Sequence, residues 1–406
     1  MLYFRLAWRN IWRNKRRTLI TTFSIVLAVV LSSVTRSMQI GSYDQMIENV
    51  AGKLTGYIQL HQDGYWEKPT LNRSFASSDT LIQHIEQTEG VETVVPRIQS
   101  YMLAAGRDKS RAALVMGIDI EKEKALSNPH KNLIEGSYFQ SNSQRGVLIS
   151  EGLASYLSIS VGDTLVLLGQ GYHGVSAAEG LPVTGIAEYG VPDLNRALAF
   201  VPLQTAQYMY GATGRLTAAS VIVDNPRSVG EITQRIRAQT SGDYEVMPWQ
   251  ELMPELVQAI EADNSGGVIM LLVLYMVVGF GIIGTILMMT AERKFELGVM
   301  VAIGTKRIRV ALMLIIELIY LALLGALTGI VLSIPVIYYF HLNPIRFSGD
   351  VAHIMQEFGM EPVMPFSTDP VILLNQAAVV LGICAVISLY PILHAYRINP
   401  IKAIQT

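Results

Sequence analysis

The chain has 406 residues, of which 50% are hydrophobic and only 16% are charged. This composition is too apolar and too poor in charge for an ordinary soluble protein, and it indicates a membrane protein. The formal net charge is −2 at pH 7. Nothing suggests a nucleic-acid partner, because the basic clusters lie beside apolar runs and form no folded basic face. The single cysteine, Cys384, excludes an intrachain disulfide.

The first predicted element is an amphipathic helix over residues 1–17. Arg5, Arg9 and Arg13 recur at helical spacing, and two tryptophans lie among them. A basic stripe beside tryptophans is typical of a helix in the lipid interface. The segment holds six basic residues and no acidic one, which places this end in the cytoplasm by the positive-inside rule. A cleavable signal peptide is the alternative, but no clear small-residue cleavage site follows, and we expect an uncleaved span.

Four apolar runs are long enough to cross a membrane, for which about 20 residues are needed. The predicted spans are residues 18–38, 265–290, 310–340 and 371–393. The loop 341–370 has an excess of acids that suits the outer side, and it ends in Asp369-Pro370, a good start for the fourth helix. The basic tail, residues 394–406, returns to the cytoplasm. The sequence therefore predicts a membrane α-helical protein with four transmembrane helices and both termini in the cytoplasm.

Residues 39–264 form a predicted large α+β extracytoplasmic domain between the first two spans, with about 225 residues, enough for one or two compact cores. From residue 40 on, the segment holds sixteen Lys/Arg and twenty-six Asp/Glu, so it is acidic. Its hydrophobic periodicity switches between strand and helix spacing, and we expect a β-α-β module split by a β-rich insertion at about 131–205. The expected strands of the module are 57–61, 91–101, 112–117, 218–223 and 244–247, with helices beginning near 78 and 226; those of the insertion are 164–168, 181–188 and 198–202. A helix over residues 249–262 leads into the second span.

The link between the second and third spans, residues 291–309, carries five Lys/Arg and two Glu, which places it in the cytoplasm. We predict a short rigid helix that ends at Gly304. One side of this helix presents four apolar residues: Phe295, Val299, Met300 and Ile303. Our hypothesis is that a cytoplasmic motor grips the link and passes work through the membrane helices to the outer domain. An ordinary hairpin held by lipid headgroups is the alternative.

Within the third span, Glu317 lies about two turns from the start, where a charge exposed to lipid costs at least a few kcal/mol. We expect it to be protonated, to snorkel inward or to pair with a polar group in the bundle, and a structural hydrogen bond is favoured over a functional role. Gly325 and Gly329 of this span permit close helix packing. Three glycines of the second span do the same: Gly279, Gly281 and Gly284.

No catalytic chemistry is expected from this chain. The phosphate-binding pattern G-x-x-x-x-G-K-[ST] is absent, and the nearest fragment is residues 51–54. The seven histidines are scattered without metal-ligand spacing. The serine at position 150 lacks the preceding glycine of a nucleophile elbow. We therefore predict no catalytic residue, no metal site and no cofactor in this chain.

Several motifs resemble those of the FtsX-like/MacB-like family of ABC transporter permeases. The family's N-terminal elbow resembles residues 7–18, and its signature loop ER-x-x-E-[IL]-G-x-x-x-A-[LI]-G resembles residues 292–304. Residues 317–329 resemble the opening of the family's third helix, and residues 397–404 resemble its tail. Residues 146–203 resemble its periplasmic core. The resemblance covers essentially the whole chain, which looks most like the lipoprotein-releasing (LolC/LolE-like) branch.

The resemblance implies a non-catalytic, mechanotransmitting permease subunit of the inner membrane, with its large domain in the periplasm. The implied partners are a cytoplasmic ABC ATPase dimer that binds ATP-Mg, a second permease copy or a paralogue, and the lipid bilayer. Carried onto this sequence, the signature loop assigns coupling to the ATPase to eight positions: Glu292, Arg293, Lys294, Phe295, Glu296, Gly298, Ala302 and Gly304. Val301 stands where relatives often carry a basic residue.

Three functions remain open at this point. Release of lipoproteins towards the outer membrane, with a periplasmic lipoprotein carrier, is favoured by the whole-chain resemblance and the lack of a fused ATPase. MacB-type export of peptides, drugs or other periplasmic substrates through an adaptor and an outer-membrane channel is one alternative. FtsX-like regulation of a cell-wall hydrolase is the other, although cell-division members usually have a much smaller outer domain. The segment 169–180 is a candidate partner contact or simply a mobile turn.

Overall fold

The computed structural model describes residues 9, 12–13, 15–190, 192–240, 242–292, 294–357 and 362–390. These residues form two compact units. The first unit is drawn from residues 1–44, 259–345 and 363–406, and the second from residues 45–258 and 346–362. The predicted interfacial helix, residues 1–17, lies mostly outside the described residues, and the predicted tail, residues 394–406, lies wholly outside them.

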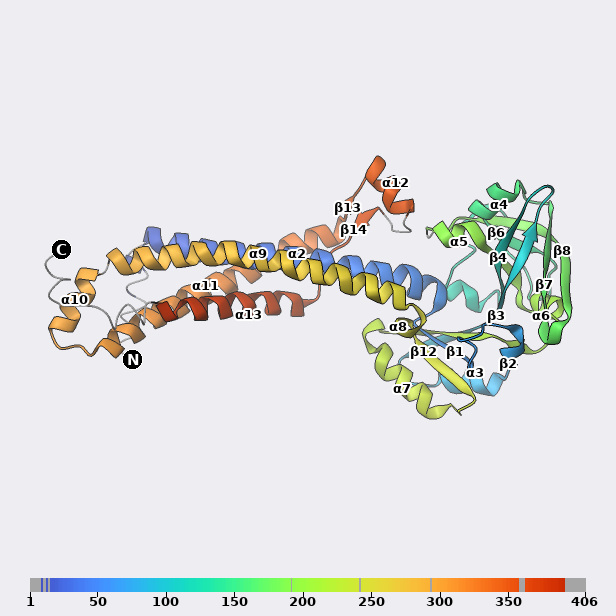
Figure 1. The fold of residues 1–406 in the computed structure, drawn as a ribbon, viewed down its shortest axis with the longest axis horizontal. Helices are drawn as coiled ribbons and strands as arrows, with labels where there is room; N and C mark the ends of the chain where they lie inside the picture. The colour runs from blue at the N-terminus through green and yellow to red at the C-terminus, as the bar shows by residue number, and fades with distance from the viewer. Residues whose placement is uncertain are drawn as a thin grey trace. The chain divides into compact units, whose positions relative to one another are not determined.

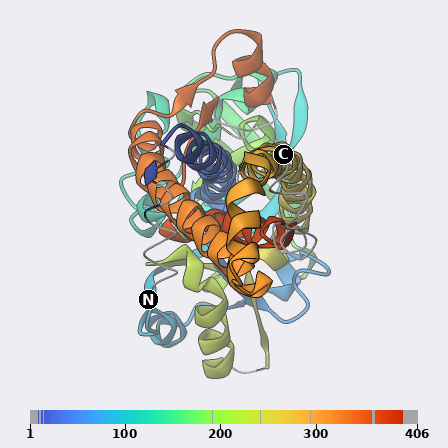
Figure 2. The same ribbon diagram turned by 90° about the vertical axis from the view of Figure 1, so that its left-hand side faces the viewer.

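The first unit contains four helices, within the described residues, that are long and apolar enough to cross a membrane, as predicted. They are α2 (Lys15–Ile47), α9 (Pro254–Glu292), α11 (Arg307–Leu342) and α13 (Pro370–Ile387). The helices run alongside one another (Figure 1), and Figure 2 looks along them from the end that carries α10 (Lys294–Ala302). Both α2 and α9 continue past the apolar runs, and α9 takes in most of the helix predicted over 249–262.

A hydrophobic cluster joins all four helices. Its buried members are Ile25, Ala28, Val29, Ile282, Ile286, Val310, Leu314, Leu318, Ala322, Ala326, Ala377, Val380 and Cys384. Where α11 meets α2, a Cβ atom on Gly325 would lie 2.6 Å from Ile25 Cγ2, so only glycine fits. Lipid is as apolar as these side chains, and such close packing is therefore what favours helix association. The glycines of α9 differ from expectation, because a Cβ atom placed on Gly281 or Gly284 would meet no described atom of a neighbouring helix within 4 Å.

Two connecting segments link the membrane helices α9, α11 and α13. The α10 helix joins α9 to α11, and three short elements lie between α11 and α13: β13 (Ile345–Arg346), α12 (Asp350–Glu357) and β14 (Val363–Met364). Asp369 caps α13, since its Oδ1 accepts a hydrogen bond of 2.9 Å from the backbone N–H of Val371. Pro370 occupies the first turn, where its missing N–H costs nothing. This start of the fourth helix is as predicted.

The second unit is built on one ten-stranded sheet with the order β12-β1-β11-β3-β4-β9-β6-β8-β5, in which β7 pairs with both β3 and β8. Two pairs, β4 with β9 and β6 with β8, are parallel, and the other pairs of this sheet are antiparallel. The strands are β1 (Ile58–Gln62), β3 (Val91–Ala105), β4 (Ser110–Ile118), β5 (Leu133–Gly136), β6 (Val147–Ser150), β7 (Thr164–Gln170), β8 (Ser176–Ala187), β9 (Leu198–Pro202), β11 (Ala218–Val223) and β12 (Tyr244–Pro248). A separate two-stranded ladder pairs β2 (Phe75–Ala76) with β10 (Arg215–Leu216).

Short helices flank this sheet. They are α3 (Asp79–Glu86), α4 (Glu151–Leu157), α5 (Pro192–Ala197), α6 (Leu203–Met209), α7 (Val229–Gln239) and α8 (Trp249–Leu252). The described residues of this unit also form four 3₁₀ turns: η2 (Leu71–Arg73), η3 (Lys122–Ala125), η4 (Tyr172–Gly174) and η5 (Pro226–Ser228). A π-helical turn, η1 (Glu48–Thr55), directly follows α2 in the chain.

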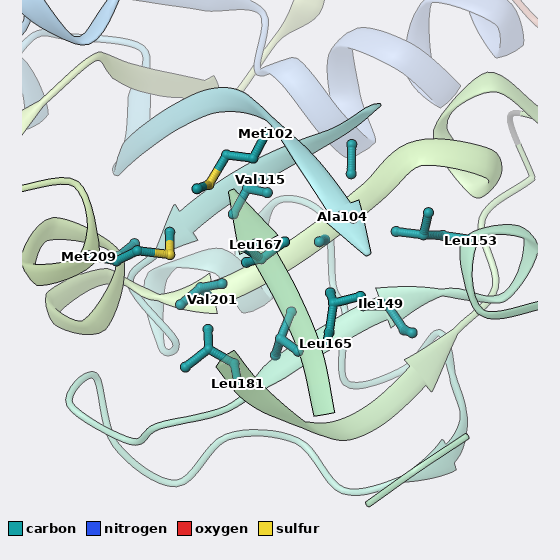
Figure 3. Close-up of a cluster of buried hydrophobic side chains, with 14 of the residues drawn as sticks. Met102, Ala104, Val115, Ile149, Leu153, Leu165, Leu167, Leu181, Val201 and Met209 are labelled. Atoms are coloured by element: carbon teal, nitrogen blue, oxygen red, sulfur yellow. The ribbon is translucent and has the colours of Figure 1, made fainter. Parts of the chain in front are cut away.

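The main core of the second unit lies where the sheet packs against α4 and α6, and Figure 3 shows ten of its labelled side chains converging. Strand alternation sends Met102 and Ala104 of β3 and Leu165 and Leu167 of β7 into this core. Their sequence neighbours on the same strands, such as Leu103, are exposed. The α+β interpretation of the large domain is therefore confirmed.

In the segment 146–204, the short helices α4 and α5 lie between the strands β6 to β9, and seven and six residues are too few for helical periodicity to be recognised. One expectation for this segment needs correction. The segment 169–180 is no open loop: β7 reaches Gln170 and β8 begins at Ser176. The reversal between them uses His173 at φ 52° and Gly174 at φ 81°. The turn between β7 and β8 is held to the helix α6 region by a hydrogen bond of 2.8 Å from the N–H of Tyr172 to the carbonyl of Tyr210.

Candidate functional site

The link between α9 and α11 is the predicted coupling segment, and most of it is the helix α10. Its C-terminal end is set by Gly304, whose φ of 99° suits glycine and strains other residues. The N–H of Thr305 donates to the carbonyl of Met300 at 3.0 Å, and that of Gly304 donates to Val301 at 3.1 Å. These two bonds are the Schellman arrangement that satisfies the last carbonyls of a helix. Gly304 thus ends this helix, as predicted.

The surface of α10 is apolar where an exposed link would be expected to be polar. Phe295 is 54% exposed and Ile303 is 80% exposed, and Ala302 is also exposed. Met300 departs from the predicted grouping, because it packs with Val301 against the hydrophobic cluster of the bundle. The inward side therefore fixes α10 to the membrane helices, while the outward side leaves large apolar groups uncovered. Exposed apolar groups next to charges are typical of contact surfaces.

One ion pair connects α10 to the N-terminal segment. Arg13 donates hydrogen bonds of 2.7 Å and 2.8 Å to the two carboxylate oxygens of Glu296. The pair is exposed, and a single guanidinium nitrogen, Nη2, donates to both carboxylate oxygens, so the pair adds only about 0–1 kcal/mol of stability. Glu296 was singled out in the sequence, but its partner was not. The two residues are 283 positions apart, and no local spacing connects them.

The other predicted coupling positions are placed only in part. Gly298 is buried on the inner side of α10. Glu292 and Lys294 lie in helices, but their side chains are outside what the structure describes, and Arg293 is outside the described residues altogether. Three basic residues at the start of α11 are exposed: Lys306, Arg307 and Arg309. The described part of the link therefore combines a basic rim with an apolar outward side.

Glu317 is fully buried in the interior of the bundle. Of the possibilities considered from the sequence, snorkelling to the membrane surface is excluded, because the side chain has no exposed area. Further along the same helix, Gly329 packs on α2. Both residues thus belong to the interface between membrane helices, where polar side chains are tolerated because they avoid lipid.

A polar network at the other end of α2 was not predicted. Arg36 donates to Asn264 of α9 at 2.7 Å, and Tyr43 donates to the carboxylate of Asp263 at 2.6 Å. Gln39 donates to Tyr43 at 2.7 Å. These bonds tie α2 to the beginning of the apolar part of α9. The available signal was Arg36 itself, a charge inside a predicted span.

For catalytic or metal chemistry, the described residues contain no group of three or more His, Cys, Asp or Glu that could hold a metal ion. The described part of the link is a short helix, capped at one end, seated on the bundle and carrying an exposed apolar side. The fold and this link define a multi-pass membrane protein whose large α+β domain is inserted between its first two membrane helices.

Comparison with known proteins agrees with this class. The family model of the MacB-like periplasmic core domain matches residues 18–239, which is more than half of the chain, and that of the FtsX-like permease C-terminal region matches residues 268–400. The chain belongs to the FtsX-like/MacB-like family of ABC transporter permeases.

Three similar proteins and one crystal structure illustrate the relationship. The lipoprotein-releasing system transmembrane protein LolC of Neisseria meningitidis is 19% identical over 349 residues, or 80% of each chain. LolE of Haemophilus influenzae is 20% identical over 63% of this chain and 62% of its own length. The macrolide export ATP-binding/permease protein MacB of Campylobacter jejuni is 28% identical over 133 residues, 31% of this chain and 17% of that protein. The crystal structure of the periplasmic region of MacB from Actinobacillus actinomycetemcomitans is 15% identical, covers 53% of this chain and 97% of that one, and has a TM-score of 0.36.

Proposed function

We propose that this permease releases lipoproteins from the inner membrane towards the outer membrane. The observation that carries the proposal is the extent of the match to LolC, which takes in 80% of both chains. A match of that extent must include parts of the membrane helices and of the large domain. The match to LolE, over 63% of this chain, supports the same branch.

In this proposal, α10 faces the cytoplasm and receives the movement of a separate ABC ATPase. Phe295 and Ile303 fill an apolar recess on the ATPase, and the basic residues at the start of α11 meet acidic groups around it. The positive-inside rule supports the orientation, because the link carries five Lys/Arg against two Glu. Because α10 is seated on the bundle, a push on it moves α9 and α11 and so reaches the domain between α2 and α9. The large domain then lies in the periplasm, and the chain pairs with a second copy or a paralogue.

Depletion of this permease in its native cell tests the proposed cargo. We expect triacylated lipoproteins to accumulate in the inner membrane fraction, as measured by membrane separation and immunoblotting of several lipoproteins. Re-expression of the unchanged chain restores sorting. Normal lipoprotein distribution after complete depletion would exclude this function while leaving the family assignment intact.

A second candidate is export of periplasmic substrates. The identity to MacB is higher, at 28%, although it is confined to 133 residues and to 17% of that protein. The same depletion strain separates the two functions. Increased sensitivity to macrolides with unchanged lipoprotein sorting would favour export.

A further inference from the structure

The second unit contains a cleft of about 440 Å³ that the proposed transport function does not use. Its volume is typical of sites for small molecules. Three segments form its walls: the π-helical turn η1, the end of η3 with the turns that follow it, and residues 188–190 with Leu194 of α5. A π-helical turn is rare in proteins and is found frequently at functional sites.

A buried ion pair holds the wall of this cleft in place. Arg97 and Glu123 are fully buried and bond to each other. Arg97 also donates to the backbone carbonyl of Leu54, and Ser127 donates its hydroxyl proton to Glu123. Leu54 and Ser127 both line the cleft. Because each partner of the ion pair also fixes a lining residue, the cleft keeps its shape without a ligand.

Two lining residues carry buried polar atoms that lack a hydrogen-bond partner among the described residues: Asn128 Oδ1 and the Tyr189 hydroxyl. The Tyr189 hydroxyl lies near the amide of Asn132, but without the geometry of an ordinary hydrogen bond. Buried polar atoms nearly always have partners, so two such atoms in one wall point to a missing molecule. Burial raises the pKa of Tyr189, so its hydroxyl keeps its proton and can donate it to a ligand.

The cleft also presents charges of both signs. Lys131 and Glu188 are exposed at its edge, and neither makes an ion pair within the described part of the chain. Lys53 and Glu48, which line the cleft as well, already bond to neighbouring side chains. Three leucines add apolar surface: Leu54, Leu126 and Leu194.

We propose that this cleft binds a small zwitterion, with an ammonium group and an anionic group attached to a short apolar chain. Lys131 and the Tyr189 hydroxyl meet the anionic group, and Glu188 and Asn128 Oδ1 accept hydrogen bonds from the ammonium group. The leucines cover the apolar chain. An amino acid and the headgroup of an ethanolamine phospholipid share this chemistry.

Titration of the full chain in nanodiscs of phosphatidylglycerol, which contain no zwitterionic lipid, tests the proposal. Calorimetry is performed with L-leucine, with 4-methylpentanoate, which lacks the ammonium group, and with isoamylamine, which lacks the carboxylate. We expect each analogue with one charge to bind at least about tenfold more weakly than leucine, since each loses a charge-assisted hydrogen bond. Equal binding of leucine and both analogues would overturn the proposal.

Substitutions then locate the site. Lys131→Gln and Glu188→Gln are each expected to weaken leucine binding about tenfold. Lys68→Gln is the matched control, because Lys68 is an exposed lysine of the same unit that does not line the cleft. Tyr189→Phe keeps the ring and removes only the hydroxyl. We expect Tyr189→Phe to weaken leucine binding. Unchanged leucine binding in this variant would overturn the role assigned to the hydroxyl.

Two further arms distinguish the source of the zwitterion. A short-chain lysophosphatidylethanolamine, used below its micelle concentration, is titrated into the same nanodiscs. Leucine is also titrated into nanodiscs of phosphatidylethanolamine, where a bound headgroup would compete with it. If the lysolipid binds and phosphatidylethanolamine in the bilayer weakens leucine binding, the natural ligand is a lipid headgroup. If leucine binds equally well in both kinds of nanodisc, the natural ligand is a soluble amino acid. If neither compound binds at millimolar concentration, the proposal fails.

Discussion

Gly329 of α11 lies so close to Val29 of α2 that a methyl group placed on it would come within 2.7 Å of the Val29 Cβ atom. Val29 is fully buried, so it cannot swing away into lipid. One turn earlier, Gly325 meets Ile25 in the same way. The contact between these two helices is therefore made by backbone against side chain, and its distance is fixed by the absence of a Cβ atom.

Gly329→Ala is therefore expected to destabilise the chain. The added methyl group forces the helices apart or strains Val29, which costs about 1–3 kcal/mol for overpacked sites. The unfolding temperature of the purified chain in detergent measures this. Gly284→Ala in α9 is the matched control, because the added Cβ atom would meet no described atom of a neighbouring helix within 4 Å and alanine is the better helix former. Equal unfolding temperatures for the two variants would contradict the packing argument.

The buried ion pair of the second unit supports a second prediction. Glu123→Ala leaves the guanidinium of Arg97 buried and without its carboxylate, which costs about 3–5 kcal/mol in comparable cases. We expect the denaturant midpoint of the chain to fall accordingly. Glu121→Ala, two residues earlier, removes a pair with Lys124 that is partly exposed, and should cost less than about 1 kcal/mol. A similar loss in the free energy of unfolding for both variants would show that the buried pair stabilises the fold no more than the exposed one.

A third prediction concerns acid sensitivity. Burial lowers the pKa of His61 from 6.5 to about 4, and its Nδ1 donates a hydrogen bond of 2.7 Å to the carbonyl of Thr217. The hydrogen bond to Thr217 favours the charged ring, as does the Oε1 atom of Gln59 at 2.9 Å from Nε2, but burial is the larger effect and favours the neutral ring. Stability from this residue is complete above the unfolded pKa of 6.5 and is lost as the pH falls from there towards 4. At pH 5 the loss is about 2 kcal/mol.

Measurement of unfolding at pH 7 and pH 5 checks this effect. His61→Gln should show a smaller difference between the two pH values than the unchanged chain, whatever its own cost at pH 7. His84→Gln provides the comparison, because His84 is exposed on α3. If the difference between pH 7 and pH 5 survives unchanged in His61→Gln, another group is responsible for it.

The elements that could be predicted from the sequence are those with a local cause. The four membrane helices follow from apolar runs longer than about 20 residues, and Asp369-Pro370 marks the start of the last. The strand β11, Ala218–Val223, has the predicted bounds because turn residues flank an apolar run. Helix α10 could be placed because Gly304 marks its end. In each case the deciding signal lies within a few residues of the element.

What could not be predicted depends on contacts between distant residues. Arg13 and Glu296 are 283 positions apart, and Arg97 and Glu123 meet only because β3 and η3 lie together in the fold. The polar extension of α2 was missed because Tyr43 and Asp44 look like the beginning of a soluble loop. They are helical because Tyr43 and its neighbours bond to α9. The cleft in the second unit was missed for the same reason, since its three walls are far apart in sequence.

The ion pair between Arg13 and Glu296 supports the last prediction, which depends on the proposed function. Glu296→Arg places two guanidinium groups together and is expected to abolish lipoprotein release, as measured by accumulation of lipoproteins in the inner membrane. Because the pair is exposed, the variant should lose less than about 1 kcal/mol of stability. Loss of release would therefore reflect a displaced link rather than unfolding. The double variant Arg13→Glu with Glu296→Arg restores an ion pair of reversed polarity and should restore release if the pair acts within this chain. If release stays absent in the double variant while protein levels are normal, restoring the pair within this chain is not sufficient for release, and the role assigned to the pair is wrong.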